Sequence, residues 1–283
     1  MLIIQTDDVG MCHSANAASL EALRHGAATS GTVMIPCPWV LEVADACRET
    51  PGLDLGIHSC FTSEWRSYKW GPVAPRNEVS SLLDDFGRFP PTVADVAQRA
   101  TADHFERELR AQIDLALRLG IHPTHLDTHM GACFARPDLL QIYLATAREY
   151  RIPPLVIRPT EENLVMLPRL LCSAANRPFL ESLEDQGFIF IDHFCRPPGG
   201  ADTIEARRES YFDQIRRCRP GVSLLVTHMA AESRELFAVM SERQARNRVF
   251  DHTIFMEGEA PKVAEEAGVQ LIGWRTVLEA FAP

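Results

Sequence analysis

The chain opens with Leu2-Ile3-Ile4-Gln5-Thr6-Asp7-Asp8, and this stretch carries the pattern from which the fold can be inferred. The apolar run over Leu2–Gln5 predicts a short buried strand. Two carboxylates follow directly, where that strand would end, and an amphipathic stretch over Ala15–Arg24 predicts a helix. A strand, a polar pair and a helix therefore form one structural unit at the start of the chain.

Similar units recur through almost the whole sequence. Apolar, β-prone runs predict further strands at 32–35, 53–57, 124–126, 155–157, 188–191, 223–226 and 269–272. Between them, the helical spacing of apolar residues predicts helices at 102–119, 138–150 and 203–217. Strands that alternate with helices are typical of an α/β fold with a largely parallel sheet.

Ionisable side chains follow six of the expected strands, and their position favours one of two architectures. They are Asp7, Asp8, His58, Asp127, His129, Arg158, Asp192, His193 and His228. In a closed barrel the carboxyl ends of all parallel strands meet at one face, whereas an open sheet would spread them along a longer edge. We therefore expect a (β/α) barrel with seven or eight largely parallel strands, formed by a single domain over residues 1–283.

One segment, residues 63–98, departs from this alternation. It has weak helical patterning, four prolines and the large aromatic residues Trp65, Tyr68 and Trp70. A long connection of this kind is usually functional or disordered, and the aromatic residues argue against disorder. We expect a long loop insertion whose aromatic side chains either line a binding site or anchor the loop to the barrel.

Composition and charge disfavour several classes of partner. The net charge of −10 disfavours a nucleic-acid groove, which needs a dense basic surface, and it also disfavours binding to an anionic membrane. The sequence contains no run of about eighteen apolar residues that would span a membrane. The N-terminus lacks the basic and apolar regions of a secretory signal, so we expect a cytoplasmic protein that acts on a small molecule.

Each polar residue at a strand end has an ordinary structural explanation as well as a functional one. Paired aspartates can form a turn and cap a helix, and a lone histidine can be a satisfied polar residue. Their convergence points instead to a metal site, because two imidazoles and one carboxylate bind a divalent cation and leave positions for water and substrate. One of Asp7 and Asp8 would be a ligand and the other a base, while His228 would be the acid. The residues thus predict a metal-dependent hydrolase.

At these positions the sequence resembles the YdjC/ChbG family of carbohydrate deacetylases, which are relatives of the polysaccharide deacetylases. The matching segments follow in the family's order and cover most of the chain. They are Asp7-Asp8-Val9-Gly10-Met11, Thr29–Met34, Gly56-Ile57-His58, Ser80–Asp84, Thr124–His129 and Thr227-His228. The resemblance implies a distorted, polysaccharide-deacetylase-like β/α barrel that removes an acetyl group from an N-acetylated amino sugar with one divalent metal ion, Zn²⁺ or Mg²⁺.

The resemblance also implies roles for individual residues. By position, Asp8, His58 and His129 would be the metal ligands, Asp7 the general base and His228 the general acid. Asp127 would orient a ligand or the base.

The sequence departs from the family pattern beside these residues, which leaves the identity of the sugar open. The departures are Met130-Gly131 in place of a second histidine, Ser59 in place of a leucine, Met229-Ala230 in place of Pro-Gly, and the added pair Cys12-His13. None of them removes a predicted ligand, base or acid.

Five further residues are candidates for substrate binding, and each has an alternative role. Arg158 and Asp192 could bind sugar hydroxyls or pair with each other. His13 could join the site or simply begin a helix. Trp65 and Trp70 could stack on the apolar face of a sugar ring or anchor their loop.

Two other functions stay open at the level of the sequence. The departures at Ser59 and Met130 are compatible with a non-catalytic carbohydrate-binding relative of the same fold. The site could also hydrolyse another ester or amide, although the absence of a Gly-rich phosphate cradle disfavours phosphoesters. A homodimer is suggested only by similar proteins.

Overall fold

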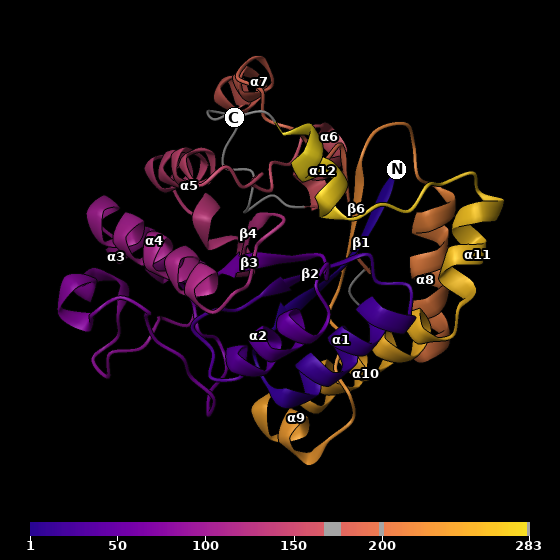
Figure 1. Ribbon diagram of the computed structural model, residues 1–283, viewed down its shortest axis with the longest axis horizontal. Helices are drawn as coiled ribbons and strands as arrows, with labels where there is room; N and C mark the ends of the chain where they lie inside the picture. Colours follow the sequence, from indigo (N-terminus) through magenta and orange to yellow (C-terminus); the bar gives the residue numbers. More distant parts are fainter. Residues whose placement is uncertain (167–176, 198–200, 282–283) are drawn as a thin grey trace.

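The computed structural model describes residues 1–166, 177–197 and 201–281 (Figure 1). A single sheet of six parallel strands forms its centre, in the order β4-β3-β2-β1-β6-β5. The strands are β1 (Leu2–Val9), β2 (Ser30–Val33), β3 (Leu55–Ser59), β4 (Leu126–Thr128), β5 (His193–Cys195) and β6 (Ser223–Thr227). The α/β class and the parallel sheet expected from the sequence are confirmed.

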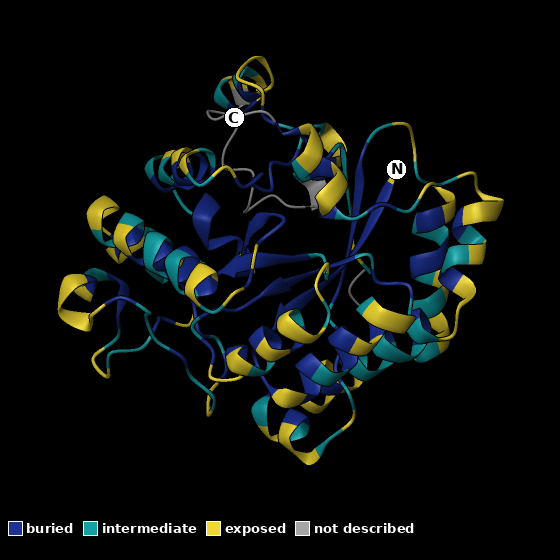
Figure 2. Ribbon diagram, in the orientation of Figure 1, coloured by how far each residue is buried: buried dark blue, intermediate teal, exposed yellow. Residues whose placement is uncertain are grey.

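The strands of the sheet are buried, and the helices around them are buried on one side and exposed on the other (Figure 2). They are α1 (His13–His25), α2 (Val40–Glu49), α3 (Val93–Arg99), α4 (Ala102–Arg118), α5 (Pro137–Glu149), α6 (Glu161–Met166), α7 (Arg177–Asp185), α8 (Ile204–Arg216), α9 (Arg234–Val239), α10 (Glu242–Met256), α11 (Glu259–Glu266) and α12 (Trp274–Ala280). In α4, the apolar residues at helical spacing, Phe105, Leu109 and Ile113, are fully buried, and the helix packs on β3.

The expected count of seven or eight strands is not confirmed among the described residues. Segments 155–157 and 269–272 take part only in isolated bridges, and the strand expected at 188–191 is replaced by β5, which begins at His193. Between the edge strands β4 and β5, single parallel bridges join Leu126 to Pro154 and Ile157 to Ile191. Pro153 and Pro154 lack the N–H that a ladder needs, so no regular strand forms here and the sheet is a curled half-barrel.

The long segment at 63–98 is irregular over most of its length and ends in α3. It contains two short 3₁₀ turns, Arg76–Glu78 and Ser80–Leu82. The buried carboxylate of Glu108 in α4 accepts hydrogen bonds from the backbone N–H groups of Val73 and Ala74, at 3.0 and 2.9 Å. The segment is therefore fastened to the helical layer rather than free in solvent.

Within the described ranges, no helix combines the length and the apolar character that crossing a membrane requires.

Candidate metal centre and active site

The two aspartates at the end of β1 face the same cavity because the strand is irregular there. Successive residues of a regular strand point to opposite faces, so Asp7 and Asp8 would normally diverge. The register between β1 and β2 shifts between Thr6 and Val9, and Asp8 has a φ of 65°, a left-handed conformation that is uncommon for aspartate. This bulge brings both carboxylates into the lining of one cavity.

The register of the sheet also brings His58 of β3 beside Asp127 of β4. The two residues are direct partners in the parallel ladder. Nδ1 of His58 donates a hydrogen bond to Oδ1 of Asp127 at 2.7 Å, and the Thr32 hydroxyl donates to the same oxygen, also at 2.7 Å. Since a carboxylate only accepts, Nδ1 of His58 carries a proton, and Nε2 is the ring nitrogen through which His58 would bind a metal.

Asp8, His58 and His129 bring three potential ligand atoms together. Oδ1 of Asp8 lies 3.5 Å from Nε2 of His58 and 3.2 Å from Nδ1 of His129. Ligands of one zinc ion, with bonds of about 2.0–2.2 Å, would be separated by roughly 3.0–3.5 Å. The same Asp8 oxygen is buried and has no hydrogen-bond partner in the part of the chain that the structure describes. The three residues therefore fit a shared cation.

A second carboxylate fixes the outer nitrogen of His129. Nε2 of His129 lies 3.0 Å from Oε2 of Glu64, so its Nδ1 faces Asp8. Both candidate histidine ligands thus carry a carboxylate on the ring nitrogen away from Asp8, the arrangement that orients metal-binding imidazoles. Burial opposes a charge on His129, but Glu64 and Asp8 raise its pKa to about 9. The pocket favours positive charge, which a divalent cation would supply.

Arg248 of α10 holds the other oxygen of Asp8. Its Nη2 donates to Oδ2 of Asp8 at 2.6 Å, and both side chains are buried. Burial opposes ionisation of Asp8, but Arg248 and the two neighbouring histidines hold the pKa of its carboxyl group well below the ordinary range. Asp8 is therefore an anion whose free oxygen points at the two imidazoles, as a metal ligand must be.

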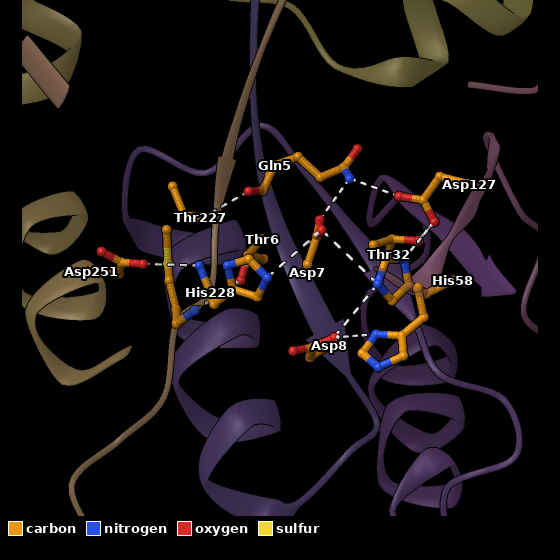
Figure 3. A network of polar contacts seen from close by, with 12 residues as sticks. Gln5, Thr6, Asp7, Asp8, Thr32, His58, Asp127, Thr227, His228 and Asp251 are labelled. Carbon is orange, nitrogen blue, oxygen red and sulfur yellow. Dashed lines mark hydrogen bonds and ion pairs between the residues drawn. The ribbon is translucent and has the colours of Figure 1, made fainter. Parts of the chain in front are cut away.

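Asp7 lies beside this group with a different environment (Figure 3). Its Oδ1 accepts a hydrogen bond from Gln5 at 2.7 Å, and its Oδ2 lies 4.0 Å from Nε2 of both His58 and His228. Burial raises the pKa of Asp7 to about 7, with a further contribution from Asp127, while His58 and Gln5 oppose the shift. A carboxyl group that titrates near neutral pH suits a general base.

His228 follows β6 on the opposite side of Asp7 from His58. Partial burial and the nearby positive charge of Arg248 and His58 lower the pKa of His228, while Asp8 opposes the shift. Its backbone N–H donates to Oδ2 of Asp251 at 3.0 Å, which fixes the turn after the strand. The imidazole keeps 40% of its side chain exposed, so it borders the open part of the cavity.

The cavity that contains these groups has a volume of about 500 Å³. Its lining combines the carboxylates and imidazoles with other polar side chains and several apolar ones. The apolar residues of the lining include Phe134, Leu155, Ile157, Leu224 and Val226. Apolar side chains together with a few polar groups are usual in a small-molecule site.

The two tryptophans of segment 63–98 lie at different distances from this cavity. Trp65 lines the cavity wall. Trp70 is buried and touches the His129 ring edge-on, with 5.8 Å between ring centroids. Trp70 therefore supports a candidate ligand, and Trp65 is the one placed to meet a substrate.

Three other predicted residues lie apart from the reaction centre. Arg158 and Asp192 pair with each other through a 2.6 Å hydrogen bond, and neither is among the described residues that line the cavity. His13 begins α1, is half exposed and pairs with Glu42 at 2.8 Å. For all three residues the structure favours the structural alternative.

Sequence reasoning missed several residues that touch the predicted groups, among them Gln5, Glu64 and Arg248. Gln5 lies two positions before Asp7, so strand alternation could have placed it on the same face. Glu64 and Arg248 have no comparable local signal, because they reach His129 and Asp8 across separations of 65 and 240 residues.

Known proteins share sequence with this chain over most of its length. The chain matches the YdjC-like protein family over residues 1–266. A carbohydrate deacetylase of Thermus thermophilus is 34% identical over 284 residues, covering 99% of this chain and 95% of the relative. A carbohydrate deacetylase of Brevibacillus brevis is 33% identical over 187 residues, covering 66% of this chain and 67% of the relative.

A solved structure shares the fold. It is a putative cellobiose-phosphate cleavage protein of Enterococcus faecalis, with a TM-score of 0.78, 24% identity and 98% coverage of both chains. Together with the family match, these similarities confirm the resemblance inferred from the motifs, and the chain belongs to the YdjC-like protein family.

Proposed function

We propose that this protein is a metal-dependent hydrolase that removes the acetyl group from an N-acetylated amino sugar or a related small amide. The observation that carries the proposal is the buried Oδ1 of Asp8, which lies within 3.5 Å of two imidazole nitrogens and, among the described residues, has no hydrogen-bond partner. The deacetylase relative that spans nearly the whole chain supports the reaction class. A non-catalytic relative would need neither the base nor the acid that this chain retains.

Asp8, His58 and His129 are the residues that would hold the cation. When bound there, a divalent ion polarises the amide carbonyl and makes a water molecule more acidic. One carboxylate oxygen with two imidazole nitrogens is a donor set that zinc accepts readily, whereas magnesium prefers oxygen ligands throughout. We therefore place Zn²⁺ ahead of Mg²⁺.

Asp7 and His228 would move the protons of the reaction. Asp7 accepts the proton of the attacking water through Oδ2, because Oδ1 is already bound by Gln5. Nε2 of His228 lies 4.0 Å from that same Oδ2, on the far side of the reaction volume. Its lowered pKa leaves the resting ring neutral. His228 would therefore deliver to the leaving nitrogen the proton that Asp7 takes from the water.

In this proposal, residues 1–283 form one catalytic domain, and segment 63–98 contributes to the lining of the substrate-binding cavity. Glu64 and Trp65 are its contributions to the cavity. The indole of Trp65 is suited to the apolar face of a sugar ring. A cytoplasmic location and a homodimer stay predictions.

Acetate release from a metal-loaded sample tests this function. The purified protein is stripped with a chelator, reloaded with Zn²⁺ or Mg²⁺, and offered N-acetylglucosamine and its oligomers. We expect acetate and free amine in equal amounts from the loaded sample and neither from the stripped sample. The Asp7→Asn variant should keep its metal and lose the activity, while the matched exposed control Asp45→Asn should keep both.

Two outcomes would count against the proposal. A loaded protein that releases no acetate from any acetamido sugar contradicts the function. If Asp7→Asn empties the metal site and Asp8→Asn does not, the roles of these two residues are reversed.

A further inference from the structure

Gln5 joins the two carboxylates at the centre of the site (Figure 3). It lies two residues before Asp7 on β1, so both side chains point to the same face of the strand. Its Nε2 donates to Oδ1 of Asp7 at 2.7 Å and to Oδ2 of Asp127 at 2.8 Å. Gln5 is 1% exposed, so both bonds are shielded from bulk solvent.

Trp274 decides which way the Gln5 amide is turned. Nε1 of Trp274 donates to Oε1 of Gln5 at 2.7 Å. Because an indole only donates and carboxylates only accept, the reversed amide would face an N–H with its own N–H and two carboxylates with its oxygen. The indole is held by His125, which stacks on it with 4.6 Å between centroids and 12° between planes.

We propose that Gln5, oriented by Trp274, is the positioning residue that turns the Asp7 carboxylate toward the substrate, an inference that rests on the proposed function. Oδ1 of Asp7 is committed to Gln5, which leaves Oδ2 as the oxygen that faces His58 and His228. The same amide separates two carboxylates that would otherwise repel each other. Trp274 begins α12 and lies outside residues 1–266 that match the family.

The alternative is that Gln5 is only a buried polar residue of the half-barrel whose hydrogen bonds are satisfied. In that case its loss lowers stability and leaves turnover unchanged, as for other buried hydrogen bonds. The two explanations predict different results for a Gln5 variant. They differ in its kcat, in whether its loss of activity requires Asp7, and in where its Asp7 carboxylate lies.

Two substitutions test the chain of contacts. Gln5→Met keeps the length of the side chain and removes its donors, so we expect kcat to fall about 10- to 100-fold with KM and metal content unchanged. Trp274→Phe keeps the ring that stacks on His125 but removes the indole donor, and we expect kcat to fall about fivefold. Ser19→Ala is the matched control, because Ser19 is buried against Thr6 on the opposite face of β1, and it should leave kcat unchanged.

Coupling to Asp7 distinguishes positioning from structure. In an Asp7→Asn background, adding Gln5→Met should cause no further loss of the residual activity, because the residue it acts through is already gone. A crystal structure of Gln5→Met should show Oδ2 of Asp7 displaced from its place between His58 and His228. That readout needs no activity, so it separates a failure of this inference from a failure of the deacetylase proposal.

The inference is overturned if folded Gln5→Met keeps its kcat within twofold, or if the losses multiply in the double variant. It is also overturned if Asp7 keeps its orientation in the variant structure. If Gln5→Met does not fold, the same three measurements are made on Trp274→Phe: its kcat, the effect of combining it with Asp7→Asn, and the orientation of Asp7 in its structure.

Discussion

Two clusters of polar residues in this fold differ in their hydrogen bonding. The first cluster is Asp8, His58 and His129, and the second is Arg158, Asp192 and Glu184. At the carboxyl ends of β1, β3 and β4, Asp8, His58 and His129 are buried, and Oδ1 of Asp8 finds no hydrogen-bond partner among the residues described. Near the bridge between Ile157 and Ile191, Arg158 follows its segment in the same way. Both clusters are therefore equally visible in the sequence.

The charged groups of the second cluster pair with one another. Arg158 donates from Nε to Asp192 at 2.6 Å and from its two Nη atoms to Glu184 at 3.1 Å. The free oxygen of Asp192 accepts the backbone N–H of Val222 at 2.8 Å. Charges that neutralise one another at a half-exposed position have little left for a ligand.

The comparison shows that a strand-end position is not enough to make a site. What separates the first cluster is burial together with ligand atoms left free by outer partners, Asp127 on His58 and Glu64 on His129. The following substitutions test this difference.

His58→Ala should have the largest effect, because it removes one of three candidate ligands. We expect metal content to fall from about one ion per chain to near none, and acetate release to fall by about 1,000-fold or more. Elemental analysis and the acetate assay check both. A variant that keeps its ion would remove His58 from the ligand set.

His228→Gln should have the next effect, since it removes the acid and keeps the size and hydrogen bonding of the side chain. We expect kcat to fall about 100- to 1,000-fold with metal content unchanged. Steady-state kinetics on the loaded protein give the answer, and a loss confined to KM would argue for substrate binding instead.

Asp127→Asn should weaken metal binding without abolishing it. The substitution replaces a charged acceptor of the His58 Nδ1–H by a neutral amide, and we expect the dissociation constant for Zn²⁺ to rise about 10- to 100-fold. Competition with a chromophoric chelator measures it. Unchanged affinity would mean that Asp127 serves Asp7 alone.

Arg158→Gln should have the smallest effect, because it changes the second cluster, whose charges already pair with one another. Its pairs are partly exposed, so we expect a loss of about 0–1 kcal/mol in the free energy of unfolding and no change in kcat/KM beyond twofold. Denaturant unfolding and kinetics are the measurements. A tenfold loss in kcat/KM would bring Arg158 back as a substrate-binding residue.

The sequence by itself determined the local elements and the ends of the strands. The helices expected at 102–119 and 138–150 appear as α4 and α5, and the strand expected at 223–226 appears as β6, because hydrophobic periodicity reports the backbone directly. Since the carboxyl ends of parallel strands lie on one side, the approach of Asp8, His58 and His129 could also be predicted.

Only the tertiary structure decided how many strands form and which atoms of the site stay free. The Pro153-Pro154 pair turns an expected strand into isolated bridges, and the bulge at Asp8 points two consecutive aspartates into one cavity. The partners Arg248 and Trp274 come from helices near the end of the chain. Such contacts follow from packing between distant elements, and local periodicity carries no information about them.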